Sequence, residues 1–290
     1  MKLKHVFCIA VIAGGSAWIA QAQLPGLGGL KNKIDNTKNK AKPATDRAEK
    51  AHEAFASWSP EEEEGIGEAS AAKMIAMFGL VESDSLNAYV NLVGTAVAQF
   101  APRQIPYRFG VLDTGMIGAF ATPGGFIFVT RGAVAGIKNE AELAGVFGHE
   151  IIHASERHLE SQLKTTKAST WAKEEGKAVK GPALLEANRA KAESLITDLF
   201  NMKLSRDKED GADERGSMLA VQAGYAPDGL MNFLITLQAS GSSPKATKAF
   251  GQLFSTHPPL DERITKLRAW VEKQPKKGVT NEQRFLDGTQ

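Results

Sequence analysis

The sequence predicts an α+β protein that is mainly helical, with a small sheet of three or four strands. Two observations lead to this class. Several long stretches repeat apolar residues every three or four positions, which is typical of amphipathic helices. Between them, residues 106–130 change to short runs of β-branched and aromatic residues separated by turn residues, which is typical of strands. With 290 residues, 42% of them hydrophobic, the chain can bury a large core.

The first 22 residues have the pattern of a secretory signal peptide. Lys2 and Lys4 precede a short apolar stretch at 6–19, and Ala-Gln-Ala at 20–22 fits the preference for small residues at a cleavage site. We expect cleavage after this motif. The alternative is an uncut signal that anchors the protein. No other stretch reaches about 18 consecutive apolar residues, so we expect no transmembrane span in the mature chain.

Charge and cysteine content narrow the function classes. The formal charge of +2 falls to 0 once Lys2 and Lys4 are removed, so nothing in the bulk charge indicates nucleic-acid binding. Cys8 is the only cysteine and lies inside the signal, so the mature chain needs no disulfide. Residues 23–58 begin rich in Gly, Lys and Asn, and we expect a flexible basic arm. The arm could make peripheral contact with an acidic membrane surface; a solvated linker is the alternative.

The main domain is predicted to span residues 59–272 and to begin with helices. Ser59 and Pro60, followed by four glutamates, form a helix start with a cap, a proline in the first turn and anions at the positive end of the helix dipole. Helical spacing continues to about residue 100. Two candidate strands follow, at 106–113 and 125–130, and the stretch TGMIGAFATPGG between them has turn residues around a third.

The second half of the domain is predicted to be helical. One helix runs from Asn139 to about Leu163, with Asn139 as its cap and Glu142 three residues later, a capping box in outline. A polar segment at 164–182 follows, with the composition of a mobile surface loop that could act as a lid. Further elements are a helical pattern at 183–223, which could be interrupted near Asn201, helices at 231–237 and 260–271, and a C-terminal tail at 273–290.

The run HEIIH at 149–153 carries the chemistry. Positions four apart return to nearly the same face of a helix, so His149 and His153 project side by side as a pair of zinc ligands. Glu150 lies at the edge of that site and can act as the base that takes a proton from water. The alternative is an amphipathic helix that carries surface histidines by chance.

A catalytic zinc site needs a third protein ligand. His158 is five positions after His153 and therefore out of phase, so we expect it beside the ligands or at the surface. Glu209 is the better candidate, because it lies on a second predicted helix with Asp213 one turn later on the same face. Asp213 could accept a hydrogen bond from a ligand imidazole and select its tautomer. From this stretch alone, a solvated acidic helix face is an equal alternative.

Three motifs occur in the same order as in a known family. They are AFATPGG before FVTRG, then HEIIHASERH, then SRDKEDGAD with AGYAPDGL. Together they resemble the zinc metallopeptidases of the H-E-x-x-H type that include HtpX, the CAAX prenyl proteases and the periplasmic proteases BepA and LoiP. The resemblance covers roughly residues 65–270. It implies a zincin-like metallopeptidase domain, with the small sheet beside the H-E-x-x-H helix and a further ligand on a second helix.

The resemblance also implies roles for individual residues. One zinc ion per chain would be bound by His149, His153 and Glu209, and Glu150 would be catalytic. Asp213 would be a second active-site acid, which is often assigned as a proton donor in this family. The role argued above, in which Asp213 orients a ligand imidazole, is the alternative.

Only the resemblance to this family suggests how access to the metal site is controlled and which proteins are cleaved. STHPPLDERI resembles a family element, and its His257 could approach the metal and plug the site. Gly118 departs from the family, in which Asn is common before the AFATPGG element. The chain lacks the several membrane spans of some members and is similar to the compact exported ones. This implies a periplasmic location and a role on unfolded or misassembled envelope proteins.

The sequence therefore predicts an exported zinc endopeptidase. A strand within FATPGGFIFV could pair its edge with an extended peptide, which favours unfolded substrates. Two other functions are open. One is a chaperone-like binding module whose zinc site is latent or plugged by His257, and the other is a zinc hydrolase that does not cleave peptides.

Overall fold

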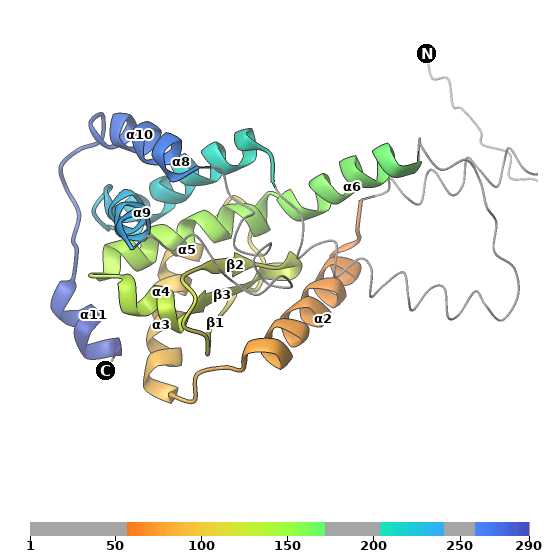
Figure 1. The fold of residues 1–290 in the computed structure, drawn as a ribbon, viewed down its shortest axis with the longest axis horizontal. Coiled ribbons are helices and arrows are strands. Elements are labelled where there is room, and N and C mark those ends of the chain that lie inside the picture. Colours follow the sequence, from red (N-terminus) through yellow and green to blue (C-terminus); the bar gives the residue numbers. More distant parts are fainter. Residues whose placement is uncertain (1–56, 172–203, 241–258, 290) are drawn as a thin grey trace, which may run out of the picture. The chain divides into compact units, whose positions relative to one another are not determined.

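The computed structural model describes residues 57–171, 204–240 and 259–289, all within the unit Ala54–Gln290 (Figure 1). The expected signal peptide, nearly all of the basic arm, residues 172–203 and His257 lie outside the described residues. The helices are α2 (Pro60–Phe78), α3 (Asp84–Ala98), α4 (Arg131–Gly136), α5 (Glu140–Ser155), α6 (His158–Trp171), α8 (Arg206–Gln222), α9 (Gly229–Ala239), α10 (Leu260–Val271) and α11 (Glu282–Thr289). None of these described helices combines the length and apolar character that crossing a bilayer requires.

The sheet has three strands, β1 (Arg108–Leu112), β2 (Ala119–Ala121) and β3 (Phe126–Thr130), in the order β1-β3-β2. The predicted class, mainly helical with a small sheet, is therefore confirmed. β1 pairs with β3 in parallel, and β2 pairs with β3 antiparallel. The turn from β2 to β3 contains Gly124 (φ 71°) and Gly125 (φ 86°), which occupy the left-handed region that glycine adopts without strain. This turn leaves β2 as an outer strand, in contact with α5.

The helical region predicted to reach residue 100 is divided into α2 and α3. The start of α2 is as expected, because Ser59 Oγ accepts from the Glu62 nitrogen at 3.2 Å and the Glu62 carboxylate accepts from the Ser59 nitrogen at 2.8 Å. Gly79, with a φ of 76°, ends α2. The extended segment that follows lies along β1, where the Val81 nitrogen donates to the Val111 carbonyl at 2.9 Å.

Helix α5 is the element on which the rest of the domain is assembled. All sixteen of its residues are buried, and it lies between α3 with the sheet on one side and α8 with α9 on the other (Figure 1). Glycines let these neighbours come close. A Cβ at Gly148 would lie 2.2 Å from the Gly216 carbonyl oxygen, and one at Gly216 would lie 2.4 Å from the His149 nitrogen. The backbones of α5 and α8 are therefore in contact right beside the HEIIH motif.

The single helix predicted at 139–163 is in fact two helices. Asn139 caps the first as expected, because its Oδ1 accepts from the Glu142 nitrogen at 3.1 Å. α5 then ends early, Arg157 adopts a positive φ of 53°, and α6 begins at His158. The break resets the helical phase of every residue that follows it.

Two other predicted boundaries differ from the structure. α6 continues to Trp171, so the expected polar loop at 164–182 begins as helix. The expected tail at 273–290 contains α11, whose Phe285 is buried in the main core. Arg284 of α11 forms an ion pair with Glu140, the first residue of α5. The C-terminal segment is therefore fastened to the helix that carries the HEIIH motif.

Candidate metal centre

His149 and His153 lie side by side on successive turns of α5. Their Nε2 atoms are 3.0 Å apart, and each is 3.7 Å from an oxygen of Glu209 on α8. All three residues are buried, with Glu209 completely inaccessible at 0% exposure. Among the described residues these three form a group whose ligand atoms lie within 4.8 Å of one another. The structure therefore brings together the three side chains that the sequence singled out.

The geometry of this group fits a single divalent ion. Two imidazole nitrogens at roughly 2.0–2.1 Å from one tetrahedral ion are about 3.3 Å apart, close to the observed separation. Burying the Glu209 carboxylate completely is unfavourable unless a positive charge compensates it. An ion held by two neutral imidazoles and one carboxylate supplies that charge. This set of three protein ligands is typical of catalytic zinc sites, which keep a fourth position open.

Asp213 lies one turn after Glu209 and contacts the other side of His149. The Nδ1 atom of His149 is 2.9 Å from Asp213 Oδ1. Arg263 of α10 grips the same carboxylate, with Nε donating to Oδ2 at 2.8 Å and Nη2 donating to Oδ1 at 2.6 Å. Burial opposes ionisation, but the Arg263 charge outweighs it and holds the pKa of Asp213 well below its usual range. Asp213 is therefore an anion that can hold a proton on His149 Nδ1 and leave Nε2 for a metal.

His158 contacts the second histidine of the motif in the same manner. Its Nδ1 lies 2.8 Å from Nδ1 of His153, and its Nε2 lies 3.2 Å from Glu156 Oε2. Burial, with the positive charges of Lys208 and Arg215, lowers the pKa of His158 to about 4. The ring is therefore neutral, and it can accept from His153 Nδ1–H while it donates to Glu156. In a continuous helix His158 would point about 140° away from His153; the break at Arg157 brings it back.

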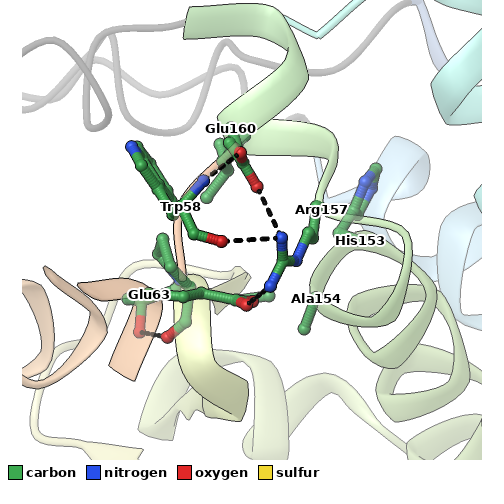
Figure 2. A pocket seen from close by; sticks show the side chains of 10 residues that line it. Trp58, Glu63, His153, Ala154, Arg157 and Glu160 are labelled. Carbon is green, nitrogen blue, oxygen red and sulfur yellow. Dashed lines mark hydrogen bonds and ion pairs between the residues drawn. The ribbon is translucent and has the colours of Figure 1, made fainter. Parts of the chain in front are cut away.

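The break at Arg157 is stabilised by a buried network that Figure 2 shows from close by. A positive φ costs a non-glycine residue about 1–2 kcal/mol. Here the guanidinium lies 2.5 Å from Glu63 Oε2 and 3.4 Å from Glu160 Oε2, and it donates to the Trp58 carbonyl at 3.1 Å. Trp58 in turn donates its nitrogen to Glu160 Oε1 at 2.9 Å. These contacts offset the strain and fasten the start of the domain to the end of α5.

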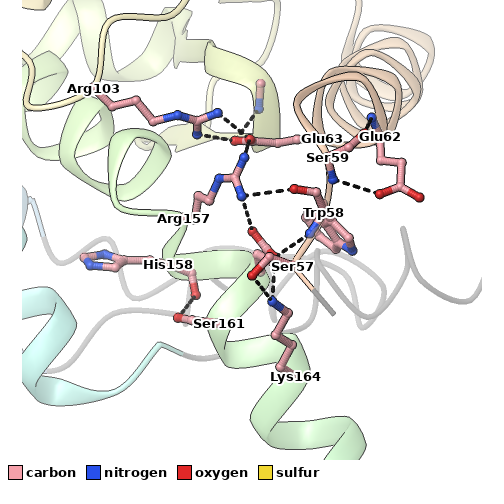
Figure 3. A network of polar contacts seen from close by, with 12 residues as sticks. Ser57, Trp58, Ser59, Glu62, Glu63, Arg103, Arg157, His158, Ser161 and Lys164 are labelled. Atoms are coloured by element: carbon pink, nitrogen blue, oxygen red, sulfur yellow. Dashed lines mark hydrogen bonds and ion pairs between the residues drawn. The ribbon is translucent and has the colours of Figure 1, made fainter. Parts of the chain in front are cut away.

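Glu63 is the centre of this network (Figure 3). It is 2% exposed, and besides Arg157 it accepts two hydrogen bonds from Arg103, at 2.6 and 2.8 Å. Burial raises the pKa of the carboxyl, but the Arg103 and Arg157 charges outweigh burial and lower it overall. The glutamates after Pro60 were predicted to serve as helix-start anions; Glu62 does so, whereas Glu63 joins α2 to the turn after the HEIIH helix.

Glu150 lines a different cavity from the one beside this network. It is 5% exposed, and together with His149 it lines a cavity of about 80 Å³ that also borders β2 and α9. A carboxylate at this position lies next to the first histidine without belonging to the group of three ligands. The site thus combines a place for a metal, a neighbouring carboxylate and an adjoining cavity.

Comparison with known proteins identifies the family. The model of peptidase family M48 matches residues 84–271, which include the three candidate ligands, Glu150 and Asp213. The chain belongs to peptidase family M48. Metalloprotease YcaL of Escherichia coli is 28% identical over 206 residues, which cover 68% of this chain and 78% of that protein. The HtpX homologue of Thermodesulfovibrio yellowstonii is 31% identical over 233 residues, covering 69% and 82%.

Longer relatives match over part of their length. The β-barrel assembly-enhancing protease of Yersinia pestis is 25% identical over 239 residues, which cover 80% of this chain and 49% of that protein. This chain thus spans about half the length of that relative. Membership of family M48 and the metalloprotease relatives make the chain a metalloendopeptidase, a hydrolase that acts on polypeptides.

The sequence did not reveal the ion pairs of three charged residues around this centre, and two of these residues carry a signal that could have shown them. Arg263 interrupts the apolar stripe of α10 between Leu260 and Leu267, which marks it as a buried cation in need of an acid. Glu63 likewise shares a face with the buried small residues of α2. Arg157 had no such signal. His158 was expected beside the ligands or at the surface, and the structure places it beside His153 through the helix break.

Proposed function

We propose that this protein is a zinc-dependent endopeptidase of the cell envelope that hydrolyses unfolded or misassembled proteins. The observation that carries the proposal is the convergence of His149, His153 and Glu209, with Glu150 next to His149 in the wall of a cavity. The metalloendopeptidase activity follows from the family. The metal, the roles of single residues, the compartment and the substrates are the parts that are proposed.

His149, His153 and Glu209 would hold the zinc. When bound there, zinc supplies a Lewis acid that polarises the scissile carbonyl and lowers the pKa of water towards about 7. Glu150 takes the proton from the attacking water and delivers it to the nitrogen of the departing amine. Its burial beside His149 keeps the carboxylate close to the reacting atoms and away from bulk solvent.

Asp213 has a different role in this proposal from that of a proton donor. Its two oxygens are gripped by Arg263 and one of them faces His149 Nδ1. Because its pKa lies well below the usual range, Asp213 carries no proton to donate near neutral pH. Asp213 instead orients His149, as carboxylates beside metal-bound histidines commonly do.

Two variants test the site. Glu150→Gln should keep zinc at one equivalent per chain and lose cleavage of unfolded casein. Glu209→Ala should lose zinc, measured by elemental analysis of the purified protein, whereas Glu214→Ala, an exposed position on the same helix, should keep both zinc and activity. Cleavage of casein by Glu150→Gln would show that Glu150 is not the catalytic base. One equivalent of zinc in Glu209→Ala would show that Glu209 is not a ligand.

The envelope role is supported by the expected signal peptide and by relatives named β-barrel assembly-enhancing proteases. Cell fractionation should find the mature protein outside the cytoplasm. Trapping with Glu150→Gln, followed by identification of the retained chains, should yield unfolded or unassembled envelope proteins. If the trap retained only cytoplasmic proteins, the envelope role would be contradicted, whereas the peptidase activity would be unaffected.

A further inference from the structure

Residues 57–59, through which the chain enters the domain, are attached to the end of the HEIIH helix (Figure 3). We call these three residues the entry segment. The Trp58 carbonyl accepts from Arg157 Nη1 at 3.1 Å, and the Trp58 nitrogen donates to Glu160 Oε1 at 2.9 Å. The entry segment therefore contacts both the break after α5 and the first turn of α6.

A small apolar cluster completes the attachment of the entry segment. The half-buried side chain of Trp58 belongs to this cluster, which is separate from the main core. The other members of the cluster are Ile66, Leu159 and Leu163. Because the main core does not include these residues, the entry segment can detach while the rest of the domain stays folded. A pull on the residues before Ser57 acts on these contacts first.

Arg157 connects the entry segment to the metal centre. Its φ of 53° is unfavourable for a residue with a Cβ, so the conformation persists only while contacts hold it. Two of these contacts come from the start of the domain, Glu63 Oε2 at 2.5 Å and the Trp58 carbonyl. The same conformation brings His158 Nδ1 to 2.8 Å from Nδ1 of His153. The entry segment thus helps to hold the break that puts His158 behind a metal ligand.

We propose that the entry segment is a control element of the peptidase, with Arg157 as the positioning residue through which it acts. While the segment is docked, Arg157 keeps its left-handed conformation and His158 supports His153. When the segment is displaced, the break relaxes, His158 withdraws and the centre loses affinity for zinc. This inference deepens the proposed function and rests on it. The entry segment precedes residues 84–271, which the M48 model matches, so the control is added to the family's centre from outside the matched region.

Thermodynamic linkage makes this control measurable from both ends. If docking of the entry segment strengthens zinc binding, zinc must strengthen the docking by the same factor. Loss of a group that orients a metal-bound histidine typically weakens metal binding about 10–100-fold. Zinc should therefore slow hydrogen exchange of the Trp58 amide by roughly 10–100-fold, measured by NMR. The Leu86 amide, which donates to Ser83 Oγ at the start of α3, is the internal control and should not respond to zinc.

Three variants test whether the coupling passes through Arg157. Trp58→Ala removes the apolar attachment and should weaken zinc binding roughly 10–100-fold, measured by competition with a chelator. Arg157→Ala should have a similar effect, because alanine disfavours the left-handed region. Arg157→Gly should bind zinc nearly as tightly as the wild type, because glycine adopts that region without strain. In that variant Glu63 still has Arg103 as its partner.

The double variant Trp58→Ala/Arg157→Gly decides the route of the coupling. With glycine at position 157 the entry segment no longer sets the break, so the double variant should bind zinc as tightly as Arg157→Gly alone. In Arg157→Gly itself, zinc should no longer slow exchange of the Trp58 amide. The visible absorption of cobalt-loaded protein, which reports ligand geometry, should change in Trp58→Ala and Arg157→Ala and stay as in the wild type in Arg157→Gly.

Ser83→Ala controls for a general loss of stability. It removes the cap of α3, away from the entry segment, and should lower Tm without changing the zinc Kd. Equal zinc Kd values for Trp58→Ala and wild type would overturn the control element and leave the peptidase activity unaffected. An effect of Trp58→Ala that persisted with glycine at position 157 would overturn the role of Arg157. The expected zinc pattern in a protein that does not cleave casein would support the coupling and contradict the proposed function.

Discussion

Replacing Gly216 with alanine tests whether the contact between α5 and α8 sets the geometry of the metal centre. The added Cβ would lie 2.4 Å from the His149 nitrogen and 2.6 Å from the Gly148 carbonyl carbon, where ordinary contact begins at 3.4 Å. Both neighbours are backbone atoms, so no side chain can rotate away. The two helices must therefore separate by about 1 Å, the difference between the contact they have and the contact they need.

The size of the effect can be worked out from that displacement. Overpacking of this kind costs about 1–3 kcal/mol, and the better helix propensity of alanine returns up to about 1 kcal/mol. A net loss of roughly 1–2 kcal/mol lowers Tm by about 2–8 °C in a domain of this size. α8 carries Glu209 and Asp213, and metal sites tolerate ligand shifts of only about 0.2 Å. We therefore expect zinc affinity to fall at least about tenfold.

The assay compares two alanine variants on one helix. At Gly211 the added Cβ would meet only the Arg215 guanidinium, the far end of a flexible side chain. Gly211→Ala should therefore keep the wild-type zinc Kd and an equal or higher Tm. Thermal unfolding followed by circular dichroism gives Tm, and competition with a chelator gives Kd. If Gly216→Ala matched Gly211→Ala in both, the close contact would not set the geometry of the centre.

Three other changes address the charges and hydrogen bonds around the centre. Arg263→Met leaves the buried Asp213 carboxylate without its guanidinium partner and should lower the free energy of unfolding in urea by about 3–5 kcal/mol. The double variant with Asp213→Asn should recover most of that loss. A double variant as unstable as Arg263→Met alone would contradict the pairing. Glu63→Gln should lower the free energy of unfolding by about 2 kcal/mol at pH 7. Because the pKa of Glu63 is lowered from 4.5, the carboxylate stabilises the fold fully above pH 4.5, and this stabilisation is lost as the pH falls through the folded-state pKa. A difference in unfolding free energy between wild type and Glu63→Gln that stayed the same at acid pH would refute the assignment. His158→Ala removes the acceptor for His153 Nδ1 and should weaken zinc roughly 10–100-fold, with partial rescue by His158→Asn; equal Kd values for wild type and alanine variant would exclude the orienting role.

Local sequence patterns predicted the parts of this molecule that depend on neighbouring residues. The cap at Ser59, the cap at Asn139 and the bounds of α10 follow from interactions within one or two helical turns. The juxtaposition of His149 and His153 follows from the same short range. Helical spacing alone does not predict that Glu209 of α8 lies near these histidines, because that distance depends on how two helices pack. The prediction also needed the motif around Glu209.

The features that the sequence did not reveal depend on pairs of residues far apart in the chain. The break after α5 exists because Arg157, in a strained conformation, meets Glu63 from α2. Helical periodicity cannot report such a contact, and a continuous helix to residue 163 was the natural expectation. His158, which we expected beside the ligands or at the surface, does lie beside His153, but the break at Arg157 brings it there and the phase of a continuous helix does not.

A charged residue on the apolar face of a helix predicts more than the sequence analysis drew from it. Arg263 and Glu63 each occupy a position that helical spacing assigns to the interior. A buried charge without a counter-charge is costly, so each position requires a partner of opposite sign that is also buried. The sequence thus shows that a partner must exist, but it offers many acids and bases as candidates. Which one it is depends on the packing of α10 against α8 and of α2 against the end of α5. In this centre the choice has a chemical consequence, because the acid that pairs with Arg263 is the one that faces His149.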